Sequence, residues 1–554
     1  MKILLVTEKC NPLDAQRDGG ARLVDTLRRA FEEDLSIMQF NPQIKSFATW
    51  NFDYPFDLPN RFDRRSANAS FIAQQVKAVE EQFTHIIFIH ISMSFGLIDL
   101  PLRPETNSWI FPMFLTPSYI ASGEIVPNRY TQMENQSLAL AKNILTPSHM
   151  EKRQLVEHYS VPEEKIHVIP RGVNTTLLES KPRYLKDDLR LCSIGSIKPQ
   201  KNTIGLIHLF SKIQHHYQNS KIKIIGPVQN QEYYEDVLLE IKRLGIENVV
   251  EFTGHITPEQ LSLAISDSHF HVSTSTCETF GRSIFETLAS GLPNIARRAG
   301  NAAAEFLQHL PYAHFVKDDN EAIQVLKKMV PHFSKLSKMA LEIGNLYNDD
   351  ILSKMLTAKI CYKNFIAICD YDGTLFHKDD PERTQRCVHA FRAYPKKVIC
   401  SARPIHDLID QLAFYELEVD WIIGCSGSIV ANGLGQILWN TPLEAKDVAY
   451  LQLLFPESKC IEHEGQVLQI ATPIESSPNV LGLRTEIYQK TAFTGHWEAS
   501  KMHAVHRLLQ HIDWSGQIRV FGDGPYDAEL LTYFDGTLIT KCPTNYHRQK
   551  NEVE

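Results

Sequence analysis

Two aspartates separated by one residue mark the most informative stretch of the chain, FIAICDYDGTLF (365–376). An uncharged apolar run leads into Asp370, and Asp372 is followed at once by Gly373 and Thr374. The apolar run predicts a buried parallel strand, and the Asp-Gly pair predicts a sharp turn at its carboxyl end. Ligands of open α/β sheets bind just beyond such strand ends. Two carboxylates held there can bind a divalent cation and attack phosphorus, so the stretch predicts a phosphate-handling site.

A lone Asp-x-Asp-Gly also fits a strand followed by an acidic turn. That interpretation is weakened because further polar residues follow in order, each at the end of an expected strand or near the start of an expected helix. They offer a hydroxyl for a phosphoryl oxygen, an ammonium group for the phosphate and the nucleophile, and more carboxylates for a cation. In chain order they are Ser401, Lys501, Asp523 and Asp527.

A second pattern lies upstream, in STSTCETFGRSIFETLASGLPNIA (273–296). Glu278 and Glu286 are eight residues apart, which places Glu278 at a loop–helix junction and Glu286 along the helix that follows. The start of a helix carries partial positive charge and free amide groups, which suit a diphosphate. A carboxylate one to two turns further on can accept hydrogen bonds from ribose hydroxyls. Two glutamates at this spacing are more often a solvated helix face, so the surrounding elements must decide.

The elements that would position these residues begin with the strand 2–7, a loop that contains Gly19 and Gly20, and an amphipathic helix over about 21–31. Strand, glycine loop and helix form an arrangement in which backbone amides face an anion, although a plain turn is an open alternative. A later strand places His90 at its carboxyl edge.

A second set of alternating strands and helices begins near residue 190, with the loop 196–202 after its first strand. Such alternation predicts a parallel, doubly wound sheet, and two such lobes in tandem predict a cleft between them. The expected strands are 189–195, 222–225, 249–252 and 269–273, and the expected helices are 203–215 and 232–244.

Bulk properties exclude several classes of protein. The 554 residues are too many for one core, and a net charge of -8 gives no support to nucleic-acid binding. The ten cysteines show no zinc-ligand spacing, which fits a reducing cytoplasm. The N-terminus reads as a strand rather than a signal peptide, and charge interrupts the most apolar stretch, 86–100. We therefore expect a cytoplasmic protein without an integral membrane segment; peripheral membrane contact and oligomeric state stay open.

Over roughly residues 1–360 the chain resembles the GT-B-fold retaining glycosyltransferases of family four. The Glu-x7-Glu pair and several flanking motifs carry this resemblance, and the second lobe is the more specific half. The flanking motifs are GSIKPQKN (195–202), IIG (224–226), FTGHI (252–256) and ASGLP (289–293).

The resemblance implies a binding site for a nucleotide-diphosphate sugar. Lys201 would grip the diphosphate, Glu278 would meet the donor sugar, and Glu286 would meet the ribose. Ser196 stands in the diphosphate loop where the family usually has arginine, and Lys198 is one candidate to supply the missing charge.

In the first lobe the resemblance implies that His90 touches the donor sugar across the cleft. Gly19 and Gly20 would form the loop near the phosphates and the acceptor. The implied reaction retains the anomeric configuration and needs no metal, because the departing diphosphate helps to deprotonate the acceptor on the same face.

Residues 364–554 resemble the haloacid dehalogenase phosphatase superfamily through the ordered set Asp-x-Asp-Gly-Thr, Ser401, Lys501 and Gly-Asp-Gly-x-x-Asp. The resemblance implies that Asp370 attacks phosphorus and that Asp372 serves as the general acid and then the general base. Mg²⁺ is the implied cofactor. Its implied ligands are Asp370, Asp372 through its backbone carbonyl, Asp523 and Asp527.

The sequence thus predicts an α/β protein of two Rossmann-like lobes followed by a doubly wound domain with an inserted α/β cap. We expect the first part to transfer a sugar to a phosphorylated acceptor and the last part to remove the phosphate. A polysaccharide or lipid-linked glycan transferase with an independent or regulatory phosphatase domain is the alternative. The expected domains are 1–185 for the acceptor lobe, 186–345 for the nucleotide-sugar lobe, 346–363 for a crossing helix, and 364–554 for the phosphatase, with its cap at about 431–493.

Overall fold

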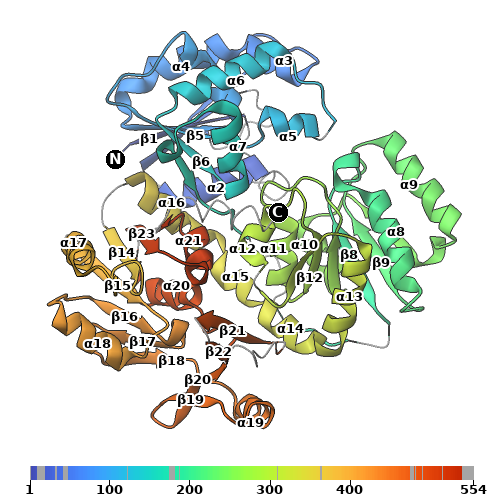
Figure 1. Cartoon of the computed structure of the whole chain (residues 1–554). Coiled ribbons are helices and arrows are strands. Elements are labelled where there is room, and N and C mark those ends of the chain that lie inside the picture. Colours follow the sequence, from blue (N-terminus) through green and yellow to red (C-terminus); the bar gives the residue numbers. More distant parts are fainter. Residues whose placement is uncertain are drawn as a thin grey trace. The chain divides into compact units, whose positions relative to one another are not determined.

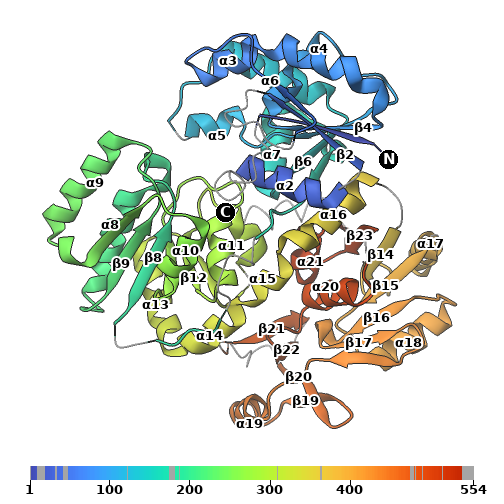
Figure 2. The ribbon, with the colours of Figure 1, turned by 180° about the vertical axis from the view of Figure 1, so that it is seen from behind.

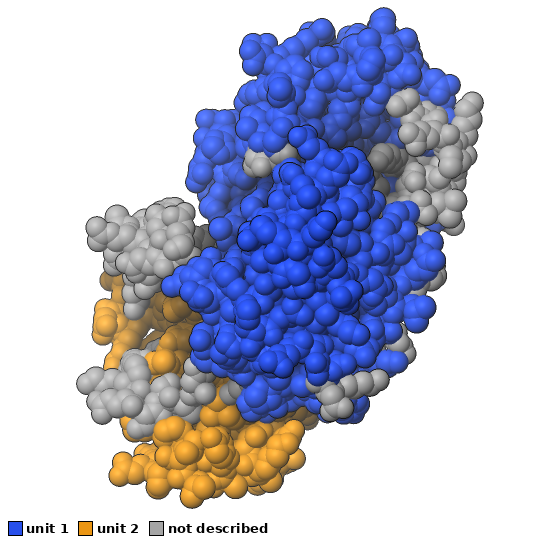
Figure 3. All heavy atoms as spheres, turned by 90° about the vertical axis from the view of Figure 1, so that its right-hand side faces the viewer, with its two compact units in different colours: residues 1–356 blue, residues 357–554 orange. Residues whose placement is uncertain are grey.

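The structure is a computed structural model. The chain divides into two compact units, Met1–Leu356 and Thr357–Glu554, coloured blue and orange in Figure 3. The four-part division predicted from the sequence is finer than these two units and stays a prediction. The residues that the structure describes are 2–8, 19–31, 34–40, 48–121, 123–173, 181–185, 188–308, 310–361, 365–392, 394–473, 480, 482–488, 491–514 and 516–538.

A seven-stranded parallel sheet forms the core of the first lobe of unit 1 (Figure 1). Its strand order is β3-β2-β1-β4-β5-β6-β7, so the winding direction reverses between β1 and β4. All five residues of β1 are buried, as an apolar strand covered on both faces requires. The strands are β1 (Ile3–Thr7), β2 (Leu35–Phe40), β3 (Trp50–Phe52), β4 (His85–Ile89), β5 (Asn107–Phe111), β6 (Asn143–Thr146) and β7 (Ile166–Val168).

Helices cover both faces of this sheet, with α3, α4 and α6 on one face and α2 on the other (Figures 1 and 2). Apolar side chains from the strands and from α3, α4 and α6 pack in one buried cluster that includes Val6, Ile72, Phe88 and Leu138. The helices are α2 (Gly19–Phe31), α3 (Arg61–Ala67), α4 (Ala69–Val79), α5 (Thr116–Ala121), α6 (Asn128–Leu140) and α7 (His149–Tyr159).

The glycine loop differs from the expectation. Helix α2 begins at Gly19, so Gly19 and Gly20 form its first turn instead of a loop before it. The first amide groups of a helix have no hydrogen-bond partner within the helix itself, and such a turn is a common place for an anion to bind. Asp18, the residue before the glycines, lies outside the described residues.

The second lobe of unit 1 contains a six-stranded parallel sheet in the order β10-β9-β8-β11-β12-β13. The predicted alternation of strands and helices is confirmed here. The strands are β8 (Arg190–Ile194), β9 (Lys221–Ile225), β10 (Val250–Gly254), β11 (Phe270–Ser273), β12 (Asn294–Arg297) and β13 (Ala313–Val316). The helices are α8 (Thr203–Gln214), α9 (Gln231–Leu244), α10 (Pro258–Ile265), α11 (Arg282–Ala289), α12 (Ala303–Leu307) and α13 (Asp319–Met329).

After the second sheet the chain returns to the first lobe through α14 (Phe333–Ala340), α15 (Glu342–Leu346) and α16 (Asp349–Cys361). The amide of Val173 donates to the carbonyl of Tyr347 at 2.7 Å. At the start of α16, the Asp349 carboxylate lies 3.3 Å from Arg22 of α2. The return that the sequence predicted for the terminal helix is therefore present within unit 1.

Unit 2 contains a seven-stranded sheet in the order β18-β17-β16-β15-β14-β23-β24. The neighbouring strands β16, β15, β14, β23 and β24 run parallel, and β17 and β18 are antiparallel additions at one edge. The strands are β14 (Phe365–Asp370), β15 (Lys396–Cys400), β16 (Trp421–Gly424), β17 (Ile429–Asn432), β18 (Ile437–Asn440), β23 (Gln517–Gly522) and β24 (Thr537–Leu538). The helices are α17 (Pro381–Arg392), α18 (Ile405–Phe414), α20 (Lys501–His511) and α21 (Ala528–Tyr533).

Unit 2 also contains a separate four-stranded antiparallel sheet, in the order β19-β20-β22-β21. The strands of this second sheet come after β18 in the chain. Residues 431–440, which the sequence placed in the cap, belong instead to the edge of the seven-stranded sheet. β17 pairs antiparallel with β16, and β18 pairs antiparallel with β17, in a hairpin that the sequence interpretation overlooked. The inserted elements are α19 (Ala445–Leu454), β19 (Lys459–His463), β20 (Gln466–Pro473), β21 (Leu483–Tyr488) and β22 (Thr491–His496).

Among the described residues, no helix is both long and apolar enough to cross a membrane. The apolar stretch 86–100 instead divides between the buried strand β4 and a 3₁₀ helix, η3 (Ile91–Ile98).

Candidate active sites

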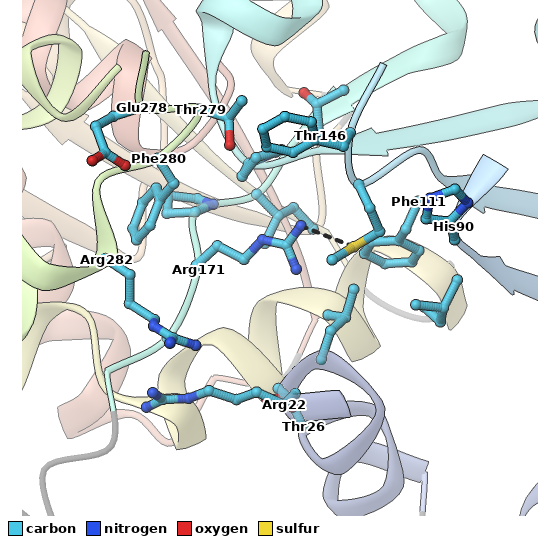
Figure 4. A pocket seen from close by; sticks show the side chains of 18 of the residues that line it. Arg22, Thr26, His90, Phe111, Thr146, Arg171, Glu278, Thr279, Phe280 and Arg282 are labelled. Atoms are coloured by element: carbon cyan, nitrogen blue, oxygen red, sulfur yellow. Dashed lines mark hydrogen bonds between the residues drawn. The ribbon is translucent and has the colours of Figure 1, made fainter. Parts of the chain in front are cut away.

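A cavity of about 560 Å³ opens in unit 1, and residues of both lobes line it (Figure 4). Among the described residues of this lining, seven Lys or Arg side chains face four carboxylates. A cleft with an excess of positive charge attracts phosphate-bearing ligands. The basic residues are Arg22, Arg61, Arg65, Arg171, Lys198, Lys201 and Arg282, and the acidic residues are Glu8, Glu124, Glu278 and Asp349.

On the second-lobe side of the cavity, Lys201 and Glu278 meet. Lys201 ends a 3₁₀ turn, Pro199–Lys201, in the loop after β8, and its Nζ lies 2.5 Å from Oε1 of Glu278. Burial, and after it the charge of Lys201, lowers the pKa of Lys198. An arriving diphosphate would compete with Glu278 for the ammonium group of Lys201.

The loop that carries Lys201 packs directly against the end of β9. A Cβ on Gly226 would lie 2.2 Å from the carbonyl oxygen of Gly195, and the φ of Gly226 is +146°. Both facts require glycine at this position. The amide of Ser196 lies beside the same contact, 3.2 Å from that Cβ position, so the expected diphosphate loop is held close to the sheet.

Glu286 lies in α11 and binds arginines from both lobes. Its Oε1 accepts from Nη1 of Arg22 at 2.9 Å and lies 3.4 Å from Nε of Arg282. Nη2 of Arg22 lies 3.3 Å from Asp349. Figure 4 shows Arg22 and Arg282 reaching toward one another. Glu286 does not line the cavity itself, but the two arginines that it binds do.

His90 follows β4 on the first-lobe wall. Its Nε2 lies 3.0 Å from Nη1 of Arg65 and 3.2 Å from the hydroxyl of Tyr119. Arg65 in turn binds both carboxylate oxygens of Glu8. Burial alone would raise the pKa of Glu8, but the charge and hydrogen bonds of Arg65 outweigh it and lower the pKa to about 2.

The cavity thus brings together His90, Lys201 and Glu278, three of the predicted transferase residues. Gly19, Gly20 and Ser196 are not part of its described lining. The sequence interpretation missed Glu8, Arg22 and Arg65 as site residues. Glu8 directly follows β1 and Arg22 lies in the first turn of α2, so their positions at a strand end and a helix start were available signals. Arg65 offered no such signal, because it lies in the middle of a helix.

In unit 2 the sheet itself assembles the second site. Asp370 pairs in register with Cys400 of β15, and Cys369 pairs with Phe521 of β23. The carboxyl ends of these neighbouring parallel strands therefore meet. That edge places Asp370 beside Ser401, which follows Cys400, and Asp523, which follows β23.

Lys501, at the start of α20, bridges two carboxylates. Its Nζ lies 2.5 Å from Oδ1 of Asp370 and 2.7 Å from Oδ1 of Asp527. Burial alone would lower the pKa of Lys501, but the two carboxylates hold it well above its usual range. Burial raises the pKa of Asp370; Lys501 opposes this rise, and Asp527 and Asp523 add to it.

The Asp372 side chain points to a different partner. Its two carboxylate oxygens accept from Nε and Nη2 of Arg403 at 2.7 and 2.6 Å. Arg403 also lies over the Tyr371 ring, 5.5 Å from its centroid, and its amide donates to Oγ of Ser401. Asp372 is thus oriented by a residue two positions after Ser401, which the sequence interpretation did not single out.

Three carboxylates in unit 2 are arranged as a divalent cation requires. Asp370, Asp523 and Asp527 each offer an oxygen, and these atoms lie within 4.8 Å of one another. Hard oxygen donors of this kind suit Mg²⁺. A Cβ on Gly373 would lie 1.9 Å from Oδ2 of Asp523, and its φ is +84°, so glycine lets Asp523 approach the turn. The side chain of Asp372 is not part of this group, which leaves only its backbone carbonyl as the expected ligand.

Two family models match the first unit. Residues 18–177 match the family described as Glycosyltransferase Family 4, and residues 177–344 match Glycosyl transferases group 1. Over residues 18–344 the chain therefore consists of glycosyltransferase domains, as the sequence resemblance predicted. The Anabaena protein HepE, solved in complex with UDP, superposes with a TM-score of 0.52 at 16% identity, covering 65% of this chain and all of that one. This likeness confirms the predicted GT-B fold.

Curated relatives match over shorter segments. An alpha-monoglucosyldiacylglycerol synthase of Streptococcus pneumoniae is 26% identical over 254 residues, 42% of this chain and 56% of that protein. A probable sucrose-phosphate synthase of Thermosipho melanesiensis is 27% identical over 218 residues, 37% of this chain and 50% of that protein. The chain thus spans about half the length of these relatives.

Proposed function

We propose that the chain is a bifunctional enzyme with two separate sites. The first unit transfers a sugar from a nucleotide-diphosphate donor to a hydroxyl of a phosphorylated acceptor and releases the nucleoside diphosphate. The second unit hydrolyses the phosphomonoester of the glycosylated product to an alcohol and inorganic phosphate. The observation that carries the proposal is the pair of opposite charge patterns, a basic cavity and an acidic cluster around one lysine.

In the transfer step, negative charge develops on the leaving diphosphate and has to be stabilised. Lys201 stands where a diphosphate would replace Glu278 as its partner, and Arg22 and Arg282 supply further charge. The donor sugar would then lie between Glu278 and His90, which come from opposite lobes. Positive groups fixed in this way stabilise a developing diphosphate without reorganisation. The acceptor proton passes to the leaving diphosphate on the same face of the sugar, which retains the anomeric configuration.

A phosphorylated acceptor fits the same cavity. After one diphosphate is bound at Lys201, basic side chains remain on the first-lobe side, among them Arg61 and Arg171. The Thermosipho relative is named a probable sucrose-phosphate synthase, and sucrose phosphate is a phosphate ester of a sugar. Both facts favour a sugar phosphate or a polyol phosphate as acceptor.

For the phosphatase step, Asp370 attacks phosphorus and forms an aspartyl-phosphate, while Asp372 donates a proton to the leaving alcohol. Asp372 then takes a proton from the water that hydrolyses the intermediate. Lys501 holds the nucleophile at 2.5 Å. A Mg²⁺ ion held by Asp370, Asp523 and Asp527 would neutralise charge on the phosphoryl oxygens. Hydrolysis of p-nitrophenyl phosphate that requires Mg²⁺ tests this assignment, and its absence would make unit 2 a binding or regulatory module.

The two steps gain from acting in sequence, because irreversible hydrolysis draws the reversible transfer forward. The test is a mass-spectrometric screen of nucleotide sugars against phosphorylated acceptors with the Asp370→Asn variant. We expect a glycosylated phosphate to accumulate in the variant and the free glycoside to form with the wild type. Free glycoside formed by the variant would refute the sequential scheme.

A lipid acceptor is the second candidate, because the streptococcal relative is named as a diacylglycerol glycoside synthase. Flotation of the protein with vesicles, with and without diacylglycerol, separates the two candidates. The phosphorylated-acceptor proposal predicts that the protein stays in the dense fractions in both cases.

A further inference from the structure

A buried ion pair lies at the first-lobe wall of the transferase cavity. Nε and Nη2 of Arg65 donate to Glu8, at 3.1 Å to Oε1 and 2.6 Å to Oε2. The hydroxyl of Tyr54 donates to Oε1 at 2.9 Å. The side chains of Arg65 and Glu8 are only 14% and 17% exposed, so both groups have lost most of their hydration.

The remaining nitrogen of Arg65 faces His90. Nη1 of Arg65 lies 3.0 Å from Nε2 of His90, and a guanidinium can only donate hydrogen bonds. Nε2 therefore accepts, and the ring proton of neutral His90 must sit on Nδ1, where Oγ of Ser92 accepts it at 2.9 Å.

One contact favours the opposite tautomer. The amide of Ser92 lies 3.2 Å from Nδ1 and could donate to it. A charge-assisted hydrogen bond is about twice as strong as a neutral one, and the Arg65 contact is also the shorter. Arg65 therefore decides the tautomer.

The backbone of His90 is held in an unusual conformation. Its φ is +79°, which few residues other than glycine adopt, while its amide donates to the carbonyl of Phe111 at 2.9 Å. Strain of this kind persists only where the surrounding structure imposes it, and it concentrates at functional sites. Hydrogen bonds thus hold the ring of a residue whose backbone is itself constrained at the cavity wall.

We propose that Glu8 and Arg65 form one positioning unit that fixes His90 with Nε2 as the acceptor toward the transferase cavity. Nη1 of Arg65 and the hydroxyl of Tyr119 stand beside Nε2, whose single lone pair accepts from Arg65, so a sugar hydroxyl that donates to Nε2 takes the place of that donor. This set matches a sugar hydroxyl, which both donates and accepts. The inference rests on the proposed sugar transfer, and Arg65 acts in it through His90.

Stability alone does not explain the pair. A buried ion pair often stabilises a fold no better than apolar residues of similar volume, whereas loss of one partner leaves an unpaired buried charge. The experiment therefore compares single variants, Arg65→Lys, Arg65→Met and Glu8→Gln, with the double variant Glu8→Gln/Arg65→Met in the full chain. Arg64→Met, a change at the next residue of the same helix, is the matched control.

We expect the double variant to fold with wild-type UDP affinity by calorimetry, because the residues expected to hold the diphosphate and the ribose, Lys201 and Glu286, lie in the second lobe. Its kcat for sugar transfer should fall at least about tenfold, since small misplacements of a positioning group cost up to about 10²-fold. The KM for the nucleotide sugar should change less than the kcat. Arg65→Lys should recover part of the kcat that Arg65→Met loses. A double variant with wild-type kcat would overturn the proposal.

A second measurement does not depend on sugar transfer. In protein labelled with ¹⁵N-histidine, comparison with His90→Gln identifies the ring signals of His90. We expect the Nδ1–H tautomer in the wild type and its loss in Arg65→Met. An Nε2–H tautomer in the wild type would refute the inference, whereas a wild type without transfer activity in the donor screen would refute only the proposed function.

Discussion

The two candidate sites balance their charges in opposite ways. In unit 1, basic side chains outnumber carboxylates around the cavity, and most pairs join residues of different elements. In unit 2, four aspartates lie near one sheet edge. Lys501 pairs with two of them and Arg403 pairs with a third. The first arrangement suits an anion directly, and the second suits an anion together with a divalent cation.

The difference also appears in the single carboxylates. Glu8 is kept ionised by Arg65, which lowers its pKa to about 2. In Asp370, burial is the largest influence and raises the pKa despite Lys501. The two candidate sites thus hold one carboxyl group whose pKa is lowered beside an arginine and one whose pKa is raised by burial.

The largest expected effect separates the two sites. Asp370→Asn removes the proposed nucleophile and should lower Mg²⁺-dependent release of phosphate from p-nitrophenyl phosphate at least about 10³-fold. Sugar transfer by the same variant should stay at the wild-type rate, because unit 1 contains its own site. A parallel loss of transfer would contradict the independence of the two sites.

Lys201→Ala is the converse test in unit 1. Loss of the ammonium group that would stabilise the leaving diphosphate should lower the kcat of transfer about 10²-fold, measured as release of nucleoside diphosphate. Phosphatase activity serves as the internal standard. Lys212→Ala, on the exposed side of α8, is the matched control and should match the wild type. Equal effects of the two lysine variants would remove Lys201 from the site.

Arg403→Lys probes the one basic residue that orients Asp372. Lysine keeps the charge but cannot make both hydrogen bonds to the carboxylate, so hydrolysis should fall about tenfold through kcat. The exposed Arg386→Lys provides the control on α17. An unchanged kcat would mean that Asp372 does not depend on this pair.

The smallest effect concerns stability. Because the folded-state pKa of Glu8 lies at about 2, below its usual 4.5, its contribution is present above pH 4.5 and is lost as the pH falls toward 2. Between pH 4.5 and 3.5 the wild type should lose about 1 kcal/mol more unfolding free energy than Glu8→Gln/Arg65→Met. Urea titrations at both pH values measure this difference, and parallel losses would show that Glu8 is not held ionised.

The acidic site was largely predictable because its residues follow from local rules. An apolar run predicts a parallel strand, and neighbouring parallel strands end at one edge. Asp370, Ser401 and Asp523 therefore meet wherever their strands are adjacent, as β15, β14 and β23 are. The edge hairpin of β17 and β18 was not foreseen, because short apolar runs of this kind also suit an inserted domain.

The basic cavity depended on tertiary structure. Arg22 meets Glu286 and Asp349, and Arg65 meets Glu8, across separations that no spacing rule connects. The sequence by itself determined two lobes of alternating strands and helices and the order of the strands' polar ends, because hydrophobic periodicity is local. Only the folded chain decided which arginine pairs with which carboxylate and which way His90 faces, because ion pairs form between side chains that the packing of distant helices brings together.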